Sequence, residues 1–140
     1  METFEKLPVE FKQKWVAALR SEEYRQAIGE LVAATIKDEE DEELEIVEIH
    51  GYCCLGVACV ISGIPEKRIV GEQLINGEVI NLLPEGFPEI LIGDNNGTNP
   101  LVMKLTRMND GHSEFRAGEL FKITKRHSFK EIADWIEENL

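Results

Sequence analysis

The sequence of 140 residues lacks several features that mark well-known classes of protein. It has only three cysteines, two of them adjacent, and this odd count argues against a disulfide framework. The longest apolar run, near Cys53, lasts about a dozen residues and is interrupted by glycines, so it is too short to span a bilayer. The first residues lack the basic patch and the apolar core of a signal peptide. We therefore expect a cytoplasmic protein that does not associate with membranes.

The chain also lacks the short motifs that accompany common chemistries. It has no glycine-rich phosphate loop, no paired zinc motif, no nucleophile elbow and no basic nucleic-acid stripe. We therefore expect no cofactor, no bound metal ion and no direct binding of nucleic acid.

The composition, with 43% hydrophobic and 30% charged residues, is typical of one globular domain spanning residues 1–140. The net charge of −12 is uneven, because residues 38–48 hold eight acids and no base. We expect an acidic loop over residues 38–45, either as a solvated turn or as a surface that mimics DNA or attracts cations. Between Lys104 and Lys130 the balance reverses to seven bases against three acids. Such a region attracts anionic ligands, although bases in a loop commonly face only solvent.

Four helices are predicted from apolar spacing and capping residues. Asn99 is a suitable N-cap before Pro100, and Ser128 with Glu131 three residues later forms a capping box. The predicted helices span residues 9–20, residues 52–62, residues 100–110 and the stretch after Ser128, in which Phe129, Ile132, Ala133 and Ile136 form a buried stripe.

Two β-hairpins are predicted, one joining residues 31–36 to 44–49 and one joining residues 68–75 to 78–82. The second depends on Asn76-Gly77, a strong signal for a two-residue turn. Residues 112–127 are expected to be loop with a short strand at 120–123. The resulting order, α-β-β-α-β-β-α-α, predicts an α+β fold of about four helices packed on short β-hairpins.

Four blocks of sequence occur in a characteristic order. They are Trp15-Val16-Ala17-Ala18-Leu19-Arg20-Ser21, Tyr52-Cys53-Cys54-Leu55-Gly56-Val57-Ala58-Cys59, Leu105-x-x-Met108-Asn109-Asp110 and Ser128-Phe129-Lys130-Glu131-Ile132-Ala133-Asp134. This order resembles a family of small proteins encoded by tailed bacteriophages and prophages, generally left as hypothetical proteins. The resemblance covers most of the chain and implies a phage origin and a shared fold. The family has no settled activity, so the resemblance implies no catalytic residue.

Two departures from the family pattern are particular to this chain. Family members tend to have a short hairpin where this chain has its acidic run. They also tend to pass quickly from the Asn109-Asp110 pair to the last helix, where this chain inserts about sixteen residues.

The cysteine segment, residues 50–59, offers zinc the Cys and His side chains that it prefers. Helical residues turn by about 100° each, so adjacent Cys53 and Cys54 point in different directions, which argues against one metal site. A second interpretation is a cysteine nucleophile whose pKa is lowered at a helix N-terminus, with a histidine as base and Asp110 as the orienting group. The third is a tightly packed helix of small buried side chains, in which Gly56 allows close approach of another element.

A polar cluster follows the first predicted helix. Arg20 can pair with a phosphate or carboxylate at two points, Tyr24 can stack on a base, and Gln26 can read an amide-like edge. In the alternative, Arg20 caps the helix C-terminus, Tyr24 packs on the core and Gln26 bonds to backbone. Asn109 and Asp110 either end a helix, because Asn accepts left-handed geometry, or bind a ribose or a cation.

Our leading hypothesis is a phage accessory protein that binds a host component without catalysis and interferes with a host function or defence. The component is either a host protein or a small nucleotide signal. The candidate ligand-binding residues are Arg20, Tyr24, Gln26, Cys53, Cys54, Asn109 and Asp110. The alternatives are a Cys-His hydrolase or transferase and an acidic DNA-mimic inhibitor that uses residues 38–48. The sequence leaves homo-oligomerisation open.

Overall fold

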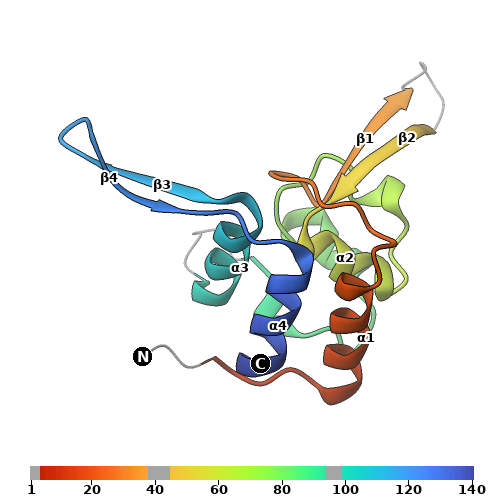
Figure 1. Cartoon of the computed structure of the whole chain (residues 1–140). Helices are drawn as coiled ribbons and strands as arrows, with labels where there is room; N and C mark the ends of the chain where they lie inside the picture. The colour runs from red at the N-terminus through yellow and green to blue at the C-terminus, as the bar shows by residue number, and fades with distance from the viewer. Residues whose placement is uncertain (1–3, 38–44, 94–98) are drawn as a thin grey trace.

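The computed structural model describes residues 4–37, 45–93 and 99–140. A body of helices and short helical turns carries two β-hairpins, which project from it in different directions (Figure 1). The predicted α+β class and its four helices are confirmed. Most of the acidic loop, residues 38–44, lies outside the described residues, and Glu45 already belongs to a strand.

The α-helices are α1 (Val9–Arg20), α2 (Cys54–Ile61), α3 (Pro100–Asp110) and α4 (Phe129–Asn139). The strands are β1 (Val32–Lys37), β2 (Glu45–Tyr52), β3 (His112–Arg116) and β4 (Glu119–Thr124). Among the described residues between α2 and α3 there are three short 3-10 helices, namely η1 (Glu66–Arg68), η2 (Gly77–Leu82) and η3 (Glu89–Leu91). The two sheets each have two antiparallel strands, β1 with β2 and β3 with β4.

The core lies where α1, α2 and α4 meet. Trp15 of α1 is fully buried, and its Nε1–H donates to the Cys54 carbonyl at 2.9 Å, which ties α1 to α2. The stripe predicted for α4 is buried, and Ser128 and Glu131 form the predicted capping box. The Asn99 side chain caps α3 by accepting from the backbone N–H of Leu101. Local capping signals therefore predicted the limits of α3 and α4 well.

The hairpin of β1 and β2 confirms the first predicted hairpin. The register pairs Val32 with Tyr52, and two irregularities interrupt the ladder. Val32 at the start of β1 and Gly51 and Tyr52 at the end of β2 are buried, whereas the strands become exposed toward Lys37 and Glu45. The hairpin is therefore anchored at its base and extends into solvent.

Helix α2 packs unusually close to the chain that leads into β1. The Leu31 carbonyl lies directly against Gly56 and accepts the backbone N–H of Cys53 at 3.2 Å. Cys53 is the N-cap, and its Sγ accepts the Gly56 N–H at 3.3 Å. The helix starts two residues later than predicted, because Tyr52 ends β2. Gly56 is required here because a Cβ would occupy the space of the Leu31 backbone.

The second predicted hairpin, residues 68–82, is wrong. Asn76 is extended with a φ of −146°, whereas a two-residue hairpin turn of type I′ or II′ requires a positive φ at its first central residue. The segment instead forms η1 and η2 and buries Ile69, Ile75 and Val79 separately against the body. Burial of single apolar side chains thus outweighs the local turn preference.

The prediction that residues 112–127 are mostly loop is wrong, whereas the short strand predicted at 120–123 is confirmed as part of β4. Strands β3 and β4 form a hairpin around Ala117 and Gly118, both with positive φ. We call residues 112–126 the arm, because the hairpin extends well beyond the body (Figure 1). Most side chains of the arm are exposed. Its strands therefore lack the alternation of buried apolar residues from which a strand is predicted.

Replacement of Gly56 by alanine tests the contact with Leu31. Gly→Ala inside a helix ordinarily stabilises by about 1 kcal/mol, but here the new Cβ meets the Leu31 carbonyl group, whose carbon is 2.6 Å from its position. We expect Gly56→Ala to lower the free energy of unfolding by about 2 kcal/mol, measured by urea denaturation. Ala17→Gly, on the exposed side of α1, is the control, because it measures the effect of helix propensity on stability without a change in packing. A more stable Gly56→Ala protein would contradict the packing.

Candidate functional site

Five of the seven candidate residues converge on one place in the structure. Asn109, at the end of α3, is the centre of this group and is 1% exposed. Its neighbours Gln26, Cys53 and Cys54 come from segments far apart in the sequence, and Asp110 is the next residue of α3. We call these five residues the Asn109 cluster.

The Asn109 amide makes hydrogen bonds to two distant chain segments and to the next residue. Its Oδ1 accepts the backbone N–H of Cys54 at 3.1 Å, at the start of α2. Its Nδ2 donates to the Ala27 carbonyl at 2.8 Å and to Asp110 Oδ1 at 2.7 Å. A buried amide left without partners costs about 1–3 kcal/mol per group, so this satisfied network is a strong structural constraint.

Gln26 extends the cluster to the start of α4. Its Nε2 donates to the His127 carbonyl at 2.7 Å and lies 3.3 Å from Asn109 Oδ1. The His127 N–H in turn donates to the Met108 carbonyl at 2.6 Å. The two ends of the arm are therefore held together by hydrogen bonds at its root.

Asp110 completes the cluster from the other side. Its Oδ1 accepts the backbone N–H of Gly29 at 3.2 Å as well as the Asn109 amide. The contacts of Asn109 and Asp110 thus agree with the interpretation in which these two residues end a helix. Gly111 follows with a φ of +80°, as expected at a helix end.

The thiols of Cys53, Cys54 and Cys59 are all buried. Burial raises the pKa of Cys53 to about 11 and that of Cys59 to about 12, and it raises the pKa of Cys54 well above its ordinary value. The hydrogen bonds of Cys53 and Cys54 go to backbone, since Cys53 Sγ accepts from Gly56 and Cys54 Sγ donates to the Leu105 carbonyl at 3.8 Å. Neutral buried thiols are poor nucleophiles and poor metal ligands.

Arg20 and Tyr24 lie outside the Asn109 cluster. Arg20 joins α1 to α4 through Asp134 at 2.6 Å and Glu137 at 2.5 Å, in an exposed ion-pair group. The ring of Tyr24 packs edge-on against Tyr52 at 5.1 Å. Both side chains therefore already have partners within the protein, and we find no shared pocket that unites them with Gln26 in the described part of the chain.

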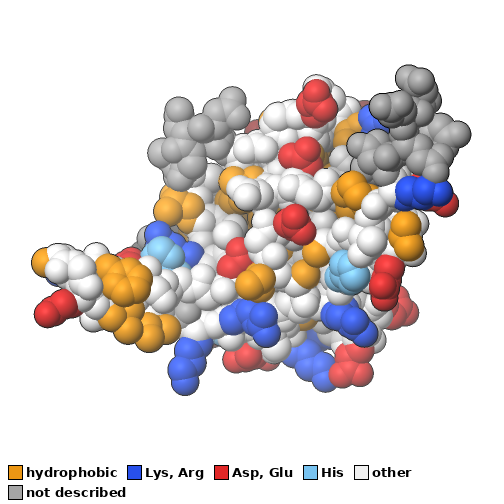
Figure 2. Space-filling view, turned by 90° about the horizontal axis from the view of Figure 1, so that it is seen from above, with side chains coloured by type: hydrophobic (Ala, Val, Ile, Leu, Met, Phe, Trp, Pro, Cys, Tyr) orange, Lys and Arg blue, Asp and Glu red, His pale blue; other side chains and the backbone are white. Residues whose placement is uncertain are grey.

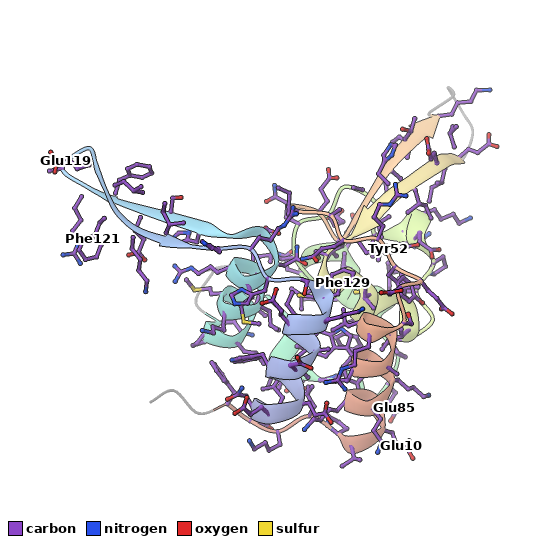
Figure 3. The ribbon with its side chains drawn as sticks, in the orientation of Figure 1. Glu10, Tyr52, Glu85, Glu119, Phe121 and Phe129 are labelled. Carbon is purple, nitrogen blue, oxygen red and sulfur yellow. The ribbon has the colours of Figure 1, made fainter. Side chains whose placement is uncertain are left out.

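The arm contains exposed apolar residues that the sequence reasoning missed. Their side chains are between about half and two thirds exposed: Phe115 64%, Leu120 52%, Phe121 53% and Ile123 58%. Figure 2 shows apolar side chains gathered along the arm, and Figure 3 places Phe121 and Glu119 on its outer part, far from Tyr52 and Phe129. The signals in the sequence were the short apolar strand predicted at 120–123 and the excess of bases between Lys104 and Lys130.

The register explains how the apolar residues of the arm are arranged. Phe115 pairs with Leu120, and Ser113 pairs with Ile123, so these positions lie on one face of the hairpin. Phe121 is the extra residue at an irregularity in the ladder, and the Arg116 guanidinium lies 3.6 Å from the centre of its ring. Glu114 and Lys122 face the other side. Phe115, Leu120 and Ile123 therefore share one face of the arm, and Glu114 and Lys122 share the other.

Within the described residues, no three His, Cys, Asp or Glu side chains lie close enough to hold a metal ion together. No helix in the same part of the chain is both long and apolar enough to cross a membrane. No protein-family model, curated protein or solved structure matches this chain. The resemblance to a phage family therefore stays a prediction.

The Asn109 cluster makes a direct prediction for stability. Asn109→Ala leaves the Cys54 N–H and the Ala27 carbonyl without their partner, so we expect the free energy of unfolding to fall by about 3 kcal/mol in urea denaturation. Asn139→Ala is the matched control, because its Nδ2 donates only within α4, to the Trp135 carbonyl. Equal losses in the two variants would show that Asn109 has no special role.

The buried thiols predict chemical inertness in the folded protein. At pH 8 the three cysteines are far below their raised pKa values and shielded from solvent, so we expect iodoacetamide to leave them unmodified. All three are expected to react once the protein is unfolded in urea, as measured by mass spectrometry. Rapid alkylation of one cysteine without unfolding would favour the Cys-His enzyme instead.

Proposed function

We propose that this chain is a phage-encoded accessory protein that binds a protein of its bacterial host, in the host cytoplasm, and acts without catalysis. Interference with host defence is one consequence that such binding would have. The observation that carries the proposal is the group of exposed apolar side chains on the arm, with Phe115, Leu120 and Ile123 on one face and Phe121 beside Arg116. Contiguous exposed apolar side chains commonly mark protein interfaces.

The arm has the geometry of an element that docks into a partner. It projects from the body, so a partner can contact both of its faces (Figure 1). Among the described residues, β3 and β4 pair only with each other, so each strand has an outer edge available for pairing. An exposed edge with side chains that alternate between two faces suits strand addition to a partner sheet or insertion into a groove.

The net charge of the arm indicates what kind of partner surface it would bind. The arm holds four bases, Arg116, Lys122, Lys125 and Arg126, against two acids, which gives it a net charge of +2 on a chain of net charge −12. We therefore expect a partner with an apolar groove bordered by acidic side chains. Electrostatic attraction of this kind raises association rates and selects partners more than it adds affinity.

A host protein is favoured over a second copy of the chain and over an enzymatic role. Two copies each carry −12, so long-range repulsion opposes their association. The three thiols are buried with raised pKa values, which disfavours the thiolate that a Cys-His enzyme needs.

Site-specific photocrosslinking in the bacterial host tests this proposal. A photoreactive phenylalanine analogue at position 121 is expected to link the chain to one discrete host protein. The same analogue at Val9, an exposed apolar position on α1, serves as the matched control and is expected to give no such product. Adding Phe115→Ser should remove the product, and Lys122→Glu should weaken it, because these changes alter the apolar side chains and the charge of the arm.

Each alternative gives a different result in this experiment. A product that consists of two copies of the chain would replace the host partner with self-association. Equal products from positions 9 and 121, or a product unaffected by Phe115→Ser, would show that the arm is not the binding element.

A further inference from the structure

A pocket of about 370 Å³ lies beside the root of the arm. Its volume falls within the range of about 300–1,000 Å³ that small-molecule sites occupy. One wall is a face of α3, where Val102, Thr106 and Asp110 follow one another at helical spacing. Gly111 and His112 close the end at which the arm begins.

Hydrogen bonds hold the opposite wall, which includes Leu74 and Gly93, against α3. The Gly93 N–H donates to the Ile75 carbonyl at 2.9 Å. The Asn99 Nδ2 donates to the Ile90 and Ile92 carbonyls at 3.0 and 2.9 Å, which joins this wall to the start of α3. These hydrogen bonds join the described walls of the pocket to one another.

Polar groups in the pocket have unused bonding capacity. The Arg107 side chain is half-buried and has no hydrogen-bond or ion-pair partner among the described residues. His112 Nε2 lies 3.6 Å from Glu114 Oε1, beyond good hydrogen-bond distance. Asp110 uses Oδ1 for Gly29 and Asn109, and no hydrogen bond of its second oxygen occurs in the described part of the chain. Arginine is well suited to bind phosphate or carboxylate at two points.

We propose that this pocket binds a small phosphate ester of mononucleotide size. The phosphate would lie against Arg107 and His112, a sugar hydroxyl would donate to Asp110, and the base would pack on Val102 and Met103. Val102 is buried and Met103 is 38% exposed, so together they supply an apolar surface that extends from the floor to the mouth. The excess of bases between Lys104 and Lys130 would attract such an anion to this side of an acidic protein.

This site is distinct from the exposed apolar side chains of the arm, and the inference does not rest on the proposed host partner. The two features meet at His112, which lines the pocket and is also the first residue of β3. A bound ligand would therefore contact the root of the arm. Failure of the crosslinking experiment would leave the pocket unaffected, because ligand binding is measured on the purified protein.

Titration of the isotope-labelled protein with adenosine monophosphate, followed by two-dimensional amide NMR, tests the inference. We expect saturable shifts confined to residues 102–112 and to Leu74 and Gly93. Arg107→Gln should weaken binding by about tenfold or more, since a charge-assisted hydrogen bond contributes about 1.5–3 kcal/mol. Arg68→Gln, an exposed arginine on η1, is the matched control and should bind like the original protein. Inorganic phosphate and adenosine, added separately, should each bind at the same amides but more weakly.

A second variant guards against a folding defect in Arg107→Gln. Met103→Glu changes an exposed side chain at the mouth of the pocket and adds a carboxylate that repels the phosphate, so it should also weaken binding about tenfold. Any of three results would overturn the inference: no saturation at millimolar nucleotide, shifts that map to Lys125 and Arg126 instead, or unchanged affinity in both pocket variants.

Discussion

The buried amide of Asn109 is the interaction on which the arrangement of this fold depends. It accepts from the first turn of α2, donates to the chain that precedes β1, and contacts the Gln26 side chain that binds the start of α4. An apolar core alone is tolerant of small shifts between its elements, whereas hydrogen bonds have narrow limits of distance and angle. This amide therefore specifies how α2, α3 and α4 meet, in addition to the stability that burial of Trp15 and its neighbours supplies.

Local signals in the sequence predicted the helices. The structure of residues 66–91 depends on tertiary contacts, and the sequence did not predict it. Asn99, Ser128 and Glu131 satisfy backbone groups within three residues, so their effect is legible in the chain itself. The 3-10 helices between residues 66 and 91 arise because separate apolar side chains reach a core built by other segments. Burial of such separate side chains leaves no periodic pattern in the sequence. Asn76-Gly77 favoured a hairpin turn locally, but packing against the core produced 3-10 helices instead.

The candidate site shows the same difference between what local sequence signals predict and what depends on tertiary contacts. The sequence reasoning selected Gln26, Cys53, Cys54, Asn109 and Asp110 by residue type, and the structure places these five together. Their hydrogen bonds are directed at one another and at backbone, so their contacts are those of a scaffold. The sequence did not indicate Arg107 or Phe121 as functional residues, because an unpartnered cation and an exposed aromatic ring have no distinctive local pattern. Their significance depends on a pocket wall and a projecting hairpin that only the fold creates.

The scaffold also explains how such a small protein holds a long projecting hairpin. The Met108 carbonyl and the Gln26 amide both bond to His127, so hydrogen bonds close the chain at the root of the arm. The entropic cost of closing a loop rises only slowly with its length, and insertions at such points disturb the core little. Exposed side chains on the arm thus contribute little to folding and are free to be selected for binding. The Asn109 cluster, by contrast, tolerates little change, because each of its polar groups serves a partner in another segment.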